Sequence, residues 1–362
     1  MEGFMNTLKG LNRRVRILII SIFICVVAAL GFLGMYFHGI GATSSKSKQV
    51  VVEIPHGSSG TEVINILNKK GLINSQMMAK LYLKMNHFQF KSNTYLLNKN
   101  MNLKEQLTII EKAPAQYIST VKFTVVDGQT VPDYASAIAK VTKLNEADIL
   151  AKWEDKTYLK QLINKYWFLS DEILSNDIYF PLEGYLWPDT YQLTKSEMTI
   201  DGITQLMLQQ TNKKLSPFKK QINSFTDGNH QYTIHQFLTL ASIVQKESPS
   251  SKKDQQIIAG ILINRLNKPM KLQCDTTVNY ANQVTKIAVT YKDLNTDSKY
   301  NTYLYEGLPI GPICSLSPKT IQSLLNYQKN DYYFFFATKD SKTIYAKDYD
   351  EHQKNINENK WY

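Results

Sequence analysis

Residues 233–248 read TIHQFLTLASIVQKES, a segment that joins a helix start signal to a long apolar run. Thr233 followed three residues later by Gln236 forms a capping-box pattern, which marks the first turn of a helix. Apolar residues then recur at helical spacing and form one stripe: Phe237, Leu240, Ala241 and Val244. The segment therefore predicts an amphipathic helix packed against the protein core.

The far end of this helix carries an acidic residue, Glu247. It continues the apolar stripe three residues after Val244, whereas Gln245 and Lys246 are expected to point elsewhere. Pro249 disfavours the helical conformation at the residue before it, so the helix is predicted to end at Glu247.

Two physical effects are expected to raise the pKa of Glu247. Partial burial beside apolar residues disfavours a carboxylate, and so does the negative end of the helix dipole. A pKa near neutrality is what a general acid needs. A solvated glutamate in a frayed last turn explains the same residue equally well, so helix geometry alone does not establish catalysis.

Four segments, in this order and spacing, resemble the YceG-like family of endolytic murein transglycosylases. They are PLEGYLWPDTY (181–191), TLASIVQKES (239–248), AGILINRLNKPMKLQCDTTVNYA (259–281) and YNTYLYEGLPIGPICSLSP (300–318). The resemblance covers roughly residues 48–360 and assigns the family's catalytic glutamate to Glu247.

Three positions depart from the pattern of that family. Many relatives carry a further glutamate two residues before the catalytic one, where this chain has Gln245, so the earlier position is interpreted as dispensable. Asn93 stands where relatives often have glycine, and residues 315–318 replace a more usual Asn-Pro-Gly ending. None of these departures removes Glu247.

The resemblance implies a lyase that cuts the β-1,4 bond between N-acetylmuramic acid and N-acetylglucosamine and leaves a 1,6-anhydro end. One carboxyl can act first as acid and then as base, whereas ordinary glycosidases use two carboxylates at set separations. A single well-placed glutamate therefore favours the lyase. Two alternatives stay open: a muramidase that uses water, and a scaffold without catalysis that binds the wall.

Six further residues in the matching segments are candidate substrate contacts, each with a structural alternative. The acids of the PLEGYLWPDTY segment either contact sugar or cap turns. The polar residues of residues 259–281 either line the site or make structural hydrogen bonds, and the tyrosine of residues 300–318 either stacks on a sugar or packs. The candidates are Glu183, Asp189, Asn264, Gln273, Asp275 and Tyr303.

The N-terminal region predicts a membrane anchor. Ile17 to Phe37 carries no charge and would span roughly 31 Å as a helix, enough to cross a bilayer core. Lys9 and three arginines precede it, whereas the next basic side chain after His38 is Lys46. The positive-inside rule then leaves the N-terminus in the cytoplasm and the rest of the chain outside. A cleaved signal peptide is the alternative, with small residues suited to cleavage only near residues 39–42.

The pattern along the chain predicts an α+β protein in five parts. A cytoplasmic tail (1–16), a transmembrane helix (17–38) and a flexible linker (39–48) precede two folded regions. The first, residues 49–112, resembles the family's LysM-like module, and the second, residues 117–362, is the expected mixed α/β catalytic domain. A strand, a glycine turn and a helix occur near Gly57 and again near Gly128, which indicates a weak repeat.

Composition restricts the partners. Lys and Arg outnumber Asp and Glu by 42 to 31, and the net charge of +11 favours an anionic neighbour. The basic residues form no block interleaved with aromatics, so nucleic acid is not expected. The six histidines form no metal motif, and no cofactor is expected. The resemblance implies peptidoglycan strands as substrate and peptidoglycan synthases or elongation and division proteins as partners.

Two cysteines lie outside the predicted membrane helix, Cys274 and Cys314. Their spacing matches no disulfide pattern, so a disulfide and a pair of buried thiols both remain open.

Overall fold

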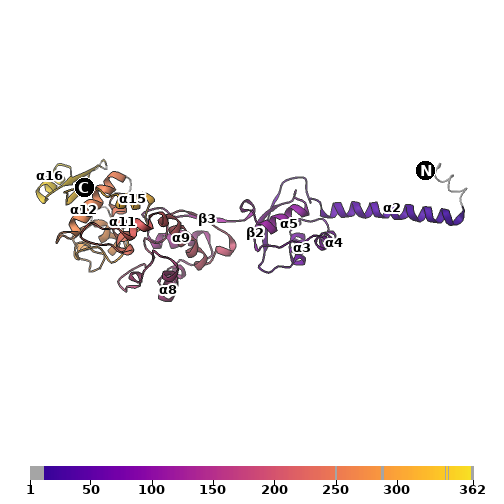
Figure 1. The fold of residues 1–362 in the computed structure, drawn as a ribbon, viewed down its shortest axis with the longest axis horizontal. Helices are drawn as coiled ribbons and strands as arrows, with labels where there is room; N and C mark the ends of the chain where they lie inside the picture. The colour runs from indigo at the N-terminus through magenta and orange to yellow at the C-terminus, as the bar shows by residue number, and fades with distance from the viewer. Residues whose placement is uncertain (1–11, 249–250, 287–288, 339, 341, 360–362) are drawn as a thin grey trace. The chain divides into compact units, whose positions relative to one another are not determined.

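The computed structural model describes residues 12–248, 251–286, 289–338, 340 and 342–359. The chain divides into two compact units, residues 1–120 with 194–196 and residues 121–193 with 197–362. Both units combine helices with two-stranded antiparallel sheets, and helices dominate (Figure 1). The predicted α+β class is confirmed at this level.

The first unit contains one long helix followed by a small α+β module. Its elements are α2 (Arg13–Ile40), β1 (Gln49–Ile54), α3 (Gly60–Lys69), α4 (Gln76–Met85), β2 (Asn93–Asn98) and α5 (Leu103–Lys112). β1 and β2 pair antiparallel, with Gln49 opposite Asn98 and Ile54 opposite Asn93. Alternate strand residues such as Val52 and Tyr95 point inward and are fully buried against the helices.

The long helix α2 is apolar enough to cross a membrane and has the length to do so. Among the described residues, it is the one helix that meets both conditions. Its apolar side chains are exposed in the absence of a bilayer, as expected for a lipid-facing surface. Length and composition fit both a membrane anchor and an N-terminal signal sequence. Part of the predicted cytoplasmic tail, residues 1–11, lies outside the described residues.

The last turn of α2 and the residues directly after it bond to the module, within the range 39–48 that is predicted as a flexible linker. Gly39 is buried, and its carbonyl accepts a hydrogen bond from the Ser75 amide at 3.3 Å. The amides of Thr43 and Ser44 both donate to the Lys99 carbonyl at 3.1 Å. Small and polar residues favour a linker in the sequence, but here they allow close backbone contact instead.

The second unit begins with a strand and a group of helices around a partly irregular segment. These elements are β3 (Val121–Thr124), α6 (Val131–Val141), α7 (Glu146–Glu154), α8 (Lys156–Lys165), β4 (Thr190–Leu193), α9 (Ile200–Leu215) and α10 (Lys219–Asn223). β3 and β4 pair antiparallel, with Val121 opposite Leu193. The turns over residues 181–186 precede β4, in agreement with the expectation that residues 179–193 are not a plain helix.

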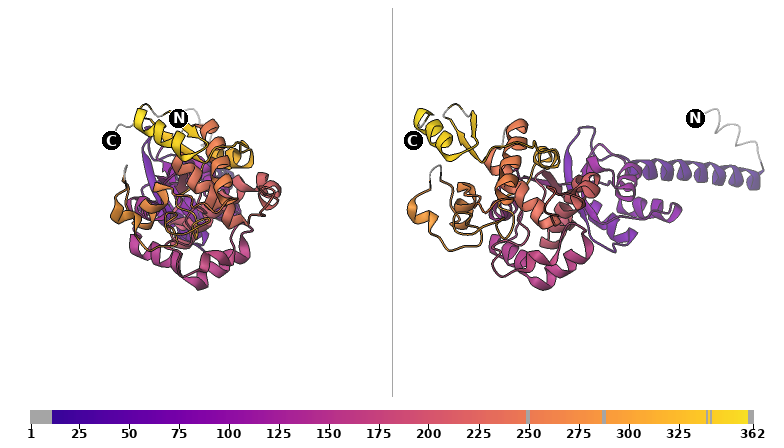
Figure 2. Two further views of the ribbon diagram at one scale, coloured as in Figure 1. Left: turned by 90° about the vertical axis from the view of Figure 1, so that its left-hand side faces the viewer. Right: turned by 60° about the vertical axis from the view of Figure 1, so that its left-hand side comes forward.

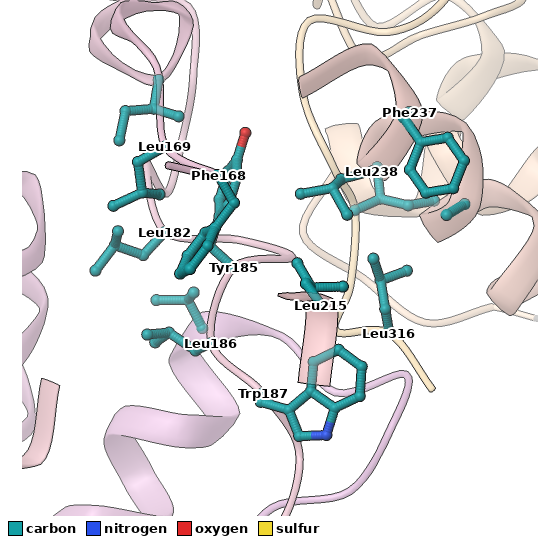
Figure 3. Close-up of a cluster of buried hydrophobic side chains, with 14 of the residues drawn as sticks. Phe168, Leu169, Leu182, Tyr185, Leu186, Trp187, Leu215, Phe237, Leu238 and Leu316 are labelled. Carbon is teal, nitrogen blue, oxygen red and sulfur yellow. The ribbon is translucent and has the colours of Figure 1, made fainter. Parts of the chain in front are cut away.

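The remaining elements of the second unit follow the opening segment of the sequence. They are α11 (Ile234–Glu247), α12 (Lys252–Leu266), α13 (Asp275–Ala281), α14 (Tyr291–Leu294), α15 (Pro318–Leu325), β5 (Phe334–Ala337), β6 (Thr343–Ala346) and α16 (Tyr349–Asn359). One large core joins both halves of this unit, and part of it is drawn in Figure 3, where Phe237 and Leu238 of α11 lie near Leu316.

The C-terminal end contains a strand that the sequence pattern did not reveal. A strand over 332–339 and a helix over 348–360 are predicted, and β5 and α16 occur there. β6 lies between them, pairs antiparallel with β5 and packs with it beside α16 (Figure 2). Four residues, Thr343–Ala346, are too short a run to show a clear alternation.

The weak repeat is confirmed as local structure. β1 leads through Gly57 to α3, and β3 leads through Gly128 to α6, with φ angles of +77° and +82° at the two glycines. Both helices begin with a capping box, formed by Ser59 with Glu62 in α3 and by Thr130 with Asp133 in α6. The left-handed backbone at each glycine explains why glycine recurs there.

Candidate active site at the end of α11

Helix α11 has the predicted start and end, but it is buried on more sides than expected. Thr233 and Gln236 form the capping box, and Ser248 leaves the helical conformation at φ −143°. Ten of its 14 residues are buried, including Gln245, because α12, α13 and α15 pack around it. The prediction that Gln245 lies away from the core is therefore wrong.

Gln245 connects α11 to the start of α15. Its Oε1 accepts hydrogen bonds from the Ser317 amide at 3.2 Å and from the Thr320 hydroxyl. Gln255 of α12 donates to the same Thr320 hydroxyl at 3.0 Å and to the Ser248 carbonyl at 2.8 Å. The two buried glutamines thereby connect α11, α12 and α15 near the end of α11.

We expect Gln245→Ala to lower the free energy of unfolding by about 1–3 kcal/mol, because two buried donors lose their acceptor. The exposed Gln221→Ala, in α10, is the matched control and should change stability by less than about 0.5 kcal/mol. Chemical denaturation of the full chain measures both effects. Equal stability of the two variants would contradict a structural role for Gln245.

Glu247 ends α11 with a half-buried side chain. The Thr276 hydroxyl in the first turn of α13 donates a hydrogen bond to its Oε1 at 2.7 Å. Burial raises the pKa of Glu247 to about 7; the Thr276 hydrogen bond opposes this rise and the charge of Asp275 adds to it. The carboxyl is therefore close to half protonated at neutral pH, as a general acid requires.

Three of the candidates from the sequence lie around the first turn of α13, where Thr276 bonds Glu247. Asp275 is its first residue and accepts a hydrogen bond from the Tyr303 hydroxyl at 2.6 Å. Burial raises the pKa of Tyr303, so this phenol stays protonated. Gln273 precedes the helix in a left-handed conformation, with φ +51°, and its amide donates to the Thr302 carbonyl at 3.1 Å. Glu247 thus has a second carboxylate and a phenol as neighbours.

The segment before α13 is held by Arg265, which is buried. Its guanidinium donates to the carbonyls of Lys271 at 3.1 Å, Leu272 at 2.8 Å and Tyr333 at 2.6 Å. It also stacks over the Phe334 ring, 4.9 Å from the centroid. Arg265 therefore holds the segment that leads into α13, whose first residues are Asp275 and Thr276.

Asn264 lies in α12 and contacts the chain segment that precedes β5. Its amide group donates to the carbonyls of Asn330 and Tyr332, both at 2.9 Å. These bonds attach the chain before β5 to α12. The structure therefore does not bring Asn264 together with Glu247, and it shows the hydrogen bonds of the structural alternative.

Glu183 and Asp189 lie in other parts of the second unit. The Glu183 side chain is buried, with an exposed fraction of 2%, and accepts bonds from the Val131 amide at 3.0 Å and the Tyr280 hydroxyl at 3.2 Å. Burial raises its pKa to about 8. Asp189 accepts from the Gln210 amide group at 2.5 Å. Tyr280 belongs to the last turn of α13, so Glu183 supports the helix that carries Thr276.

Two features of the site were not selected from the sequence. Thr276 lies in the quoted segment 259–281, next to the chosen Asp275, but a lone threonine gives no catalytic signal. Lys246 donates to the Gly128 carbonyl at 3.3 Å and so places the turn at residues 126–129 beside the end of α11. Ser315 holds the other side of this turn, accepting from the Gly128 amide at 3.0 Å.

The cysteines Cys274 and Cys314 are both buried and free. Burial raises the pKa of each thiol well above its ordinary value, so both stay protonated. This geometry selects the pair of buried thiols over the disulfide, the two alternatives that the sequence left open.

A cavity of about 480 Å³ lies at the opposite end of α11. Its walls include His235, Gln236 and residues 307–310. With 14 residues, α11 is about 21 Å long, so this cavity is separate from Glu247. His235 at its wall is already satisfied, because its ring nitrogens bond the Tyr185 hydroxyl at 2.6 Å and the Ile310 carbonyl at 2.7 Å.

A glutamate with a pKa near neutrality, held by a hydroxyl at the junction of two helices, has the properties that a general acid–base site requires. The chain matches the YceG-like family over residues 52–358, and it belongs to that family.

Named relatives and one solved structure agree with this membership. A Bacillus subtilis protein named endolytic murein transglycosylase is 33% identical, over 84% of this chain and 83% of its own length. A Streptococcus pneumoniae protein of the same name is 30% identical over 93% of this chain, which spans 64% of that longer relative. The crystal structure of a YceG-like protein from Listeria monocytogenes has a TM-score of 0.60 and 32% identity, covering 86% of this chain and 100% of that one.

Proposed function

We propose that this protein is a membrane-anchored endolytic transglycosylase of peptidoglycan, with Glu247 as its acid and base. The observation that carries the proposal is the pKa of about 7 of this half-buried carboxyl at the junction of α11 and α13. Family membership supports the substrate class, since relatives at 33% and 30% identity are named endolytic murein transglycosylases.

In the proposed reaction, protonated Glu247 gives its proton to the oxygen that leaves with N-acetylglucosamine. The bond between that oxygen and C1 of N-acetylmuramic acid breaks. The C6 hydroxyl of the same muramic acid then bonds to C1, and the Glu247 carboxylate takes its proton. The glutamate ends in its starting form, and the product carries a 1,6-anhydro ring without uptake of water.

Asp275 and Tyr303 are proposed as substrate contacts beside Glu247. The Tyr303 hydroxyl already donates to Asp275, so a sugar hydroxyl would find one carboxylate and one phenol at the same point. Gln273 precedes them in the chain and is proposed as a further contact. Glu183 and Asn264, whose polar atoms bond protein groups, are proposed as positioning residues.

A muramidase that uses water is a second candidate because Asp275 supplies the second carboxylate that hydrolysis by glycosidases ordinarily needs. Asp275 directly precedes Thr276, whose hydroxyl bonds Glu247 at 2.7 Å, so the two acids lie in the same part of the site. Digestion of purified glycan strands with the extracellular part, followed by mass measurement, decides between the two. Transglycosylase products are one water lighter than hydrolysis products, and products of the hydrolytic mass would contradict the proposal.

The membrane anchor is the other part of the proposal, and the first unit supports it over a cleaved signal. Cleavage near residues 39–42 would cut through the segment that bonds to the module. The Asn74 side chain donates to the carbonyls of His38 at 3.0 Å and Ala42 at 3.2 Å, on both sides of such a cut. A segment built into the fold is better explained as part of the mature protein.

We expect a single span with the N-terminus in the cytoplasm. Arg13, Arg14 and Arg16 precede the apolar segment, and the positive-inside rule keeps them on the cytoplasmic side. Protease added to cells stripped of their wall should degrade the chain beyond residue 40 and leave a short membrane fragment. Complete protection of the chain would contradict this orientation.

The module at residues 49–112 is proposed to hold the enzyme at its substrate, in the manner of a LysM-like domain. It has its own buried core and lies in a different unit from Glu247. Peptidoglycan synthases and division proteins are proposed partners on the ground of family membership alone.

A further inference from the structure

Helix α4 presents two different faces. Met78 and Ala79 are buried, and Tyr82 and Leu83 pack against the core of the module. The opposite side carries apolar residues at a spacing of four, which places them in one line along the helix: Met77, Leu81 and Met85. Met77 is 65% exposed and Met85 is 58% exposed, so this line faces outward.

Two lysines flank the exposed apolar line. Lys80 and Lys84 lie three and seven residues after Met77, next to the line along the same side of α4. Apolar side chains beside lysines are typical of a helix that lies in the boundary of a membrane, where the lysine stems cover apolar surface and the amines reach the headgroups.

The structure places α4 alongside the end of the membrane helix. α2 and α4 pack against each other, and both lie at the same end of the first unit in Figure 1. Gly39 leaves space for this contact, since a Cβ there would stand 2.7 Å from Cβ of Met78.

This contact also sets the level of α4 relative to the predicted span. Met78 lies in the first turn of α4, and Gly39 lies in the last turn of α2, directly after the predicted span of residues 17–38. α4 therefore begins where the predicted span ends.

We propose that the outward face of α4, formed by Met77, Leu81 and Met85 with Lys80 and Lys84, lies in the outer surface of the bilayer that α2 crosses, against anionic lipid headgroups. The inference rests on the proposed function of α2 as a retained membrane span. Its consequence is a module with a fixed orientation to the membrane, because the hydrogen bonds of Asn74 and Ser75 to the end of α2 remove a free hinge.

The test places a fluorescent label on Met77→Cys in the full chain, in a background with Cys25→Ala. Cys274 and Cys314 are buried and should not be labelled. The chain is inserted into vesicles of phosphatidylcholine and phosphatidylglycerol that contain a lipid with a nitroxide on its headgroup. We expect strong quenching of the label at residue 77.

His56→Cys is the matched control in the same unit. This exposed residue follows the far end of β1, about 20 Å from the start of the strand, while the start is linked through Lys99 to the segment after α2. Its label should be quenched weakly. Equal, weak quenching at both positions would overturn the proposal for α4.

Extraction of the vesicles with alkali separates this result from failure of the anchor. A chain that alkali releases has no membrane span, which would overturn the anchor and this inference together. A retained chain with an unquenched label at residue 77 would overturn the inference alone. Lys80→Glu with Lys84→Glu should reduce the quenching in phosphatidylglycerol vesicles, and an unchanged signal would contradict the preference for anionic lipid.

Discussion

Glu247→Gln is expected to reduce the formation of anhydro products by about 10²–10⁴-fold, the usual loss when a general acid is removed. Glutamine keeps the size of the side chain and an oxygen that accepts the 2.7 Å hydrogen bond from Thr276. It has no proton to give to the leaving oxygen and cannot take one from the C6 hydroxyl. The fold and the binding of glycan strands should therefore survive while turnover is lost.

The measurement is the rate of product formation from purified glycan strands, with binding measured separately by cosedimentation. Glu358→Gln is the matched control, because this exposed glutamate of α16 makes the same chemical change far along the chain from α11. The control should keep its turnover. A Glu247→Gln protein with near-normal turnover would refute the assignment of the acid.

Turnover is expected to depend on pH through Glu247. The first step needs the protonated carboxyl, and burial raises the pKa of this group to about 7. Well below pH 7 nearly all of the carboxyl is protonated, and well above pH 7 its protonated fraction falls about tenfold per pH unit. The value of kcat/KM on soluble strands should therefore be about 100-fold lower at pH 9 than at pH 6. A flat profile between these values would contradict the role of Glu247 as the acid.

Thr276 supplies a variant that moves this profile in a known direction. Its hydroxyl stabilises the charged carboxylate, so its hydrogen bond lowers the pKa of Glu247. Thr276→Val removes the donor and keeps the shape, so the fall in kcat/KM should shift upward by about one pH unit. Thr276→Ser keeps the hydroxyl and should leave the profile in place. A profile that stays fixed in the valine variant would mean that Thr276 acts on the fold alone.

Local structure was predictable where the signal lies within a few residues. The capping box at Thr233 and the proline after Ser248 determine both ends of α11, because each acts on the backbone of its own turn. The repeated glycine turns at Gly57 and Gly128 were visible for the same reason, since left-handed backbone favours glycine wherever the chain folds back. Apolar length likewise predicted α2.

Contacts between distant segments could not be read in this way. Gln245 looked like a polar residue off the apolar stripe, yet it is buried because α15, more than 70 residues later, brings Ser317 and Thr320 to it. The same limit hid the packing of Gly39 against Met78 and the hydrogen bonds of Thr43 and Ser44 to the Lys99 carbonyl, all within the residues predicted as a linker.

The sequence by itself determined the helix that ends in Glu247, the apolar N-terminal helix and the resemblance that selects one glutamate from many acids. The tertiary structure alone decided what surrounds that glutamate. It brings Thr276 and Asp275 to Glu247 from almost 30 residues away. It also places the Asn264 side chain against the chain segment before β5, where it bonds the Tyr332 carbonyl. The physical reason is that a pKa depends on burial and on charges in space, whereas a sequence motif records only order along the chain.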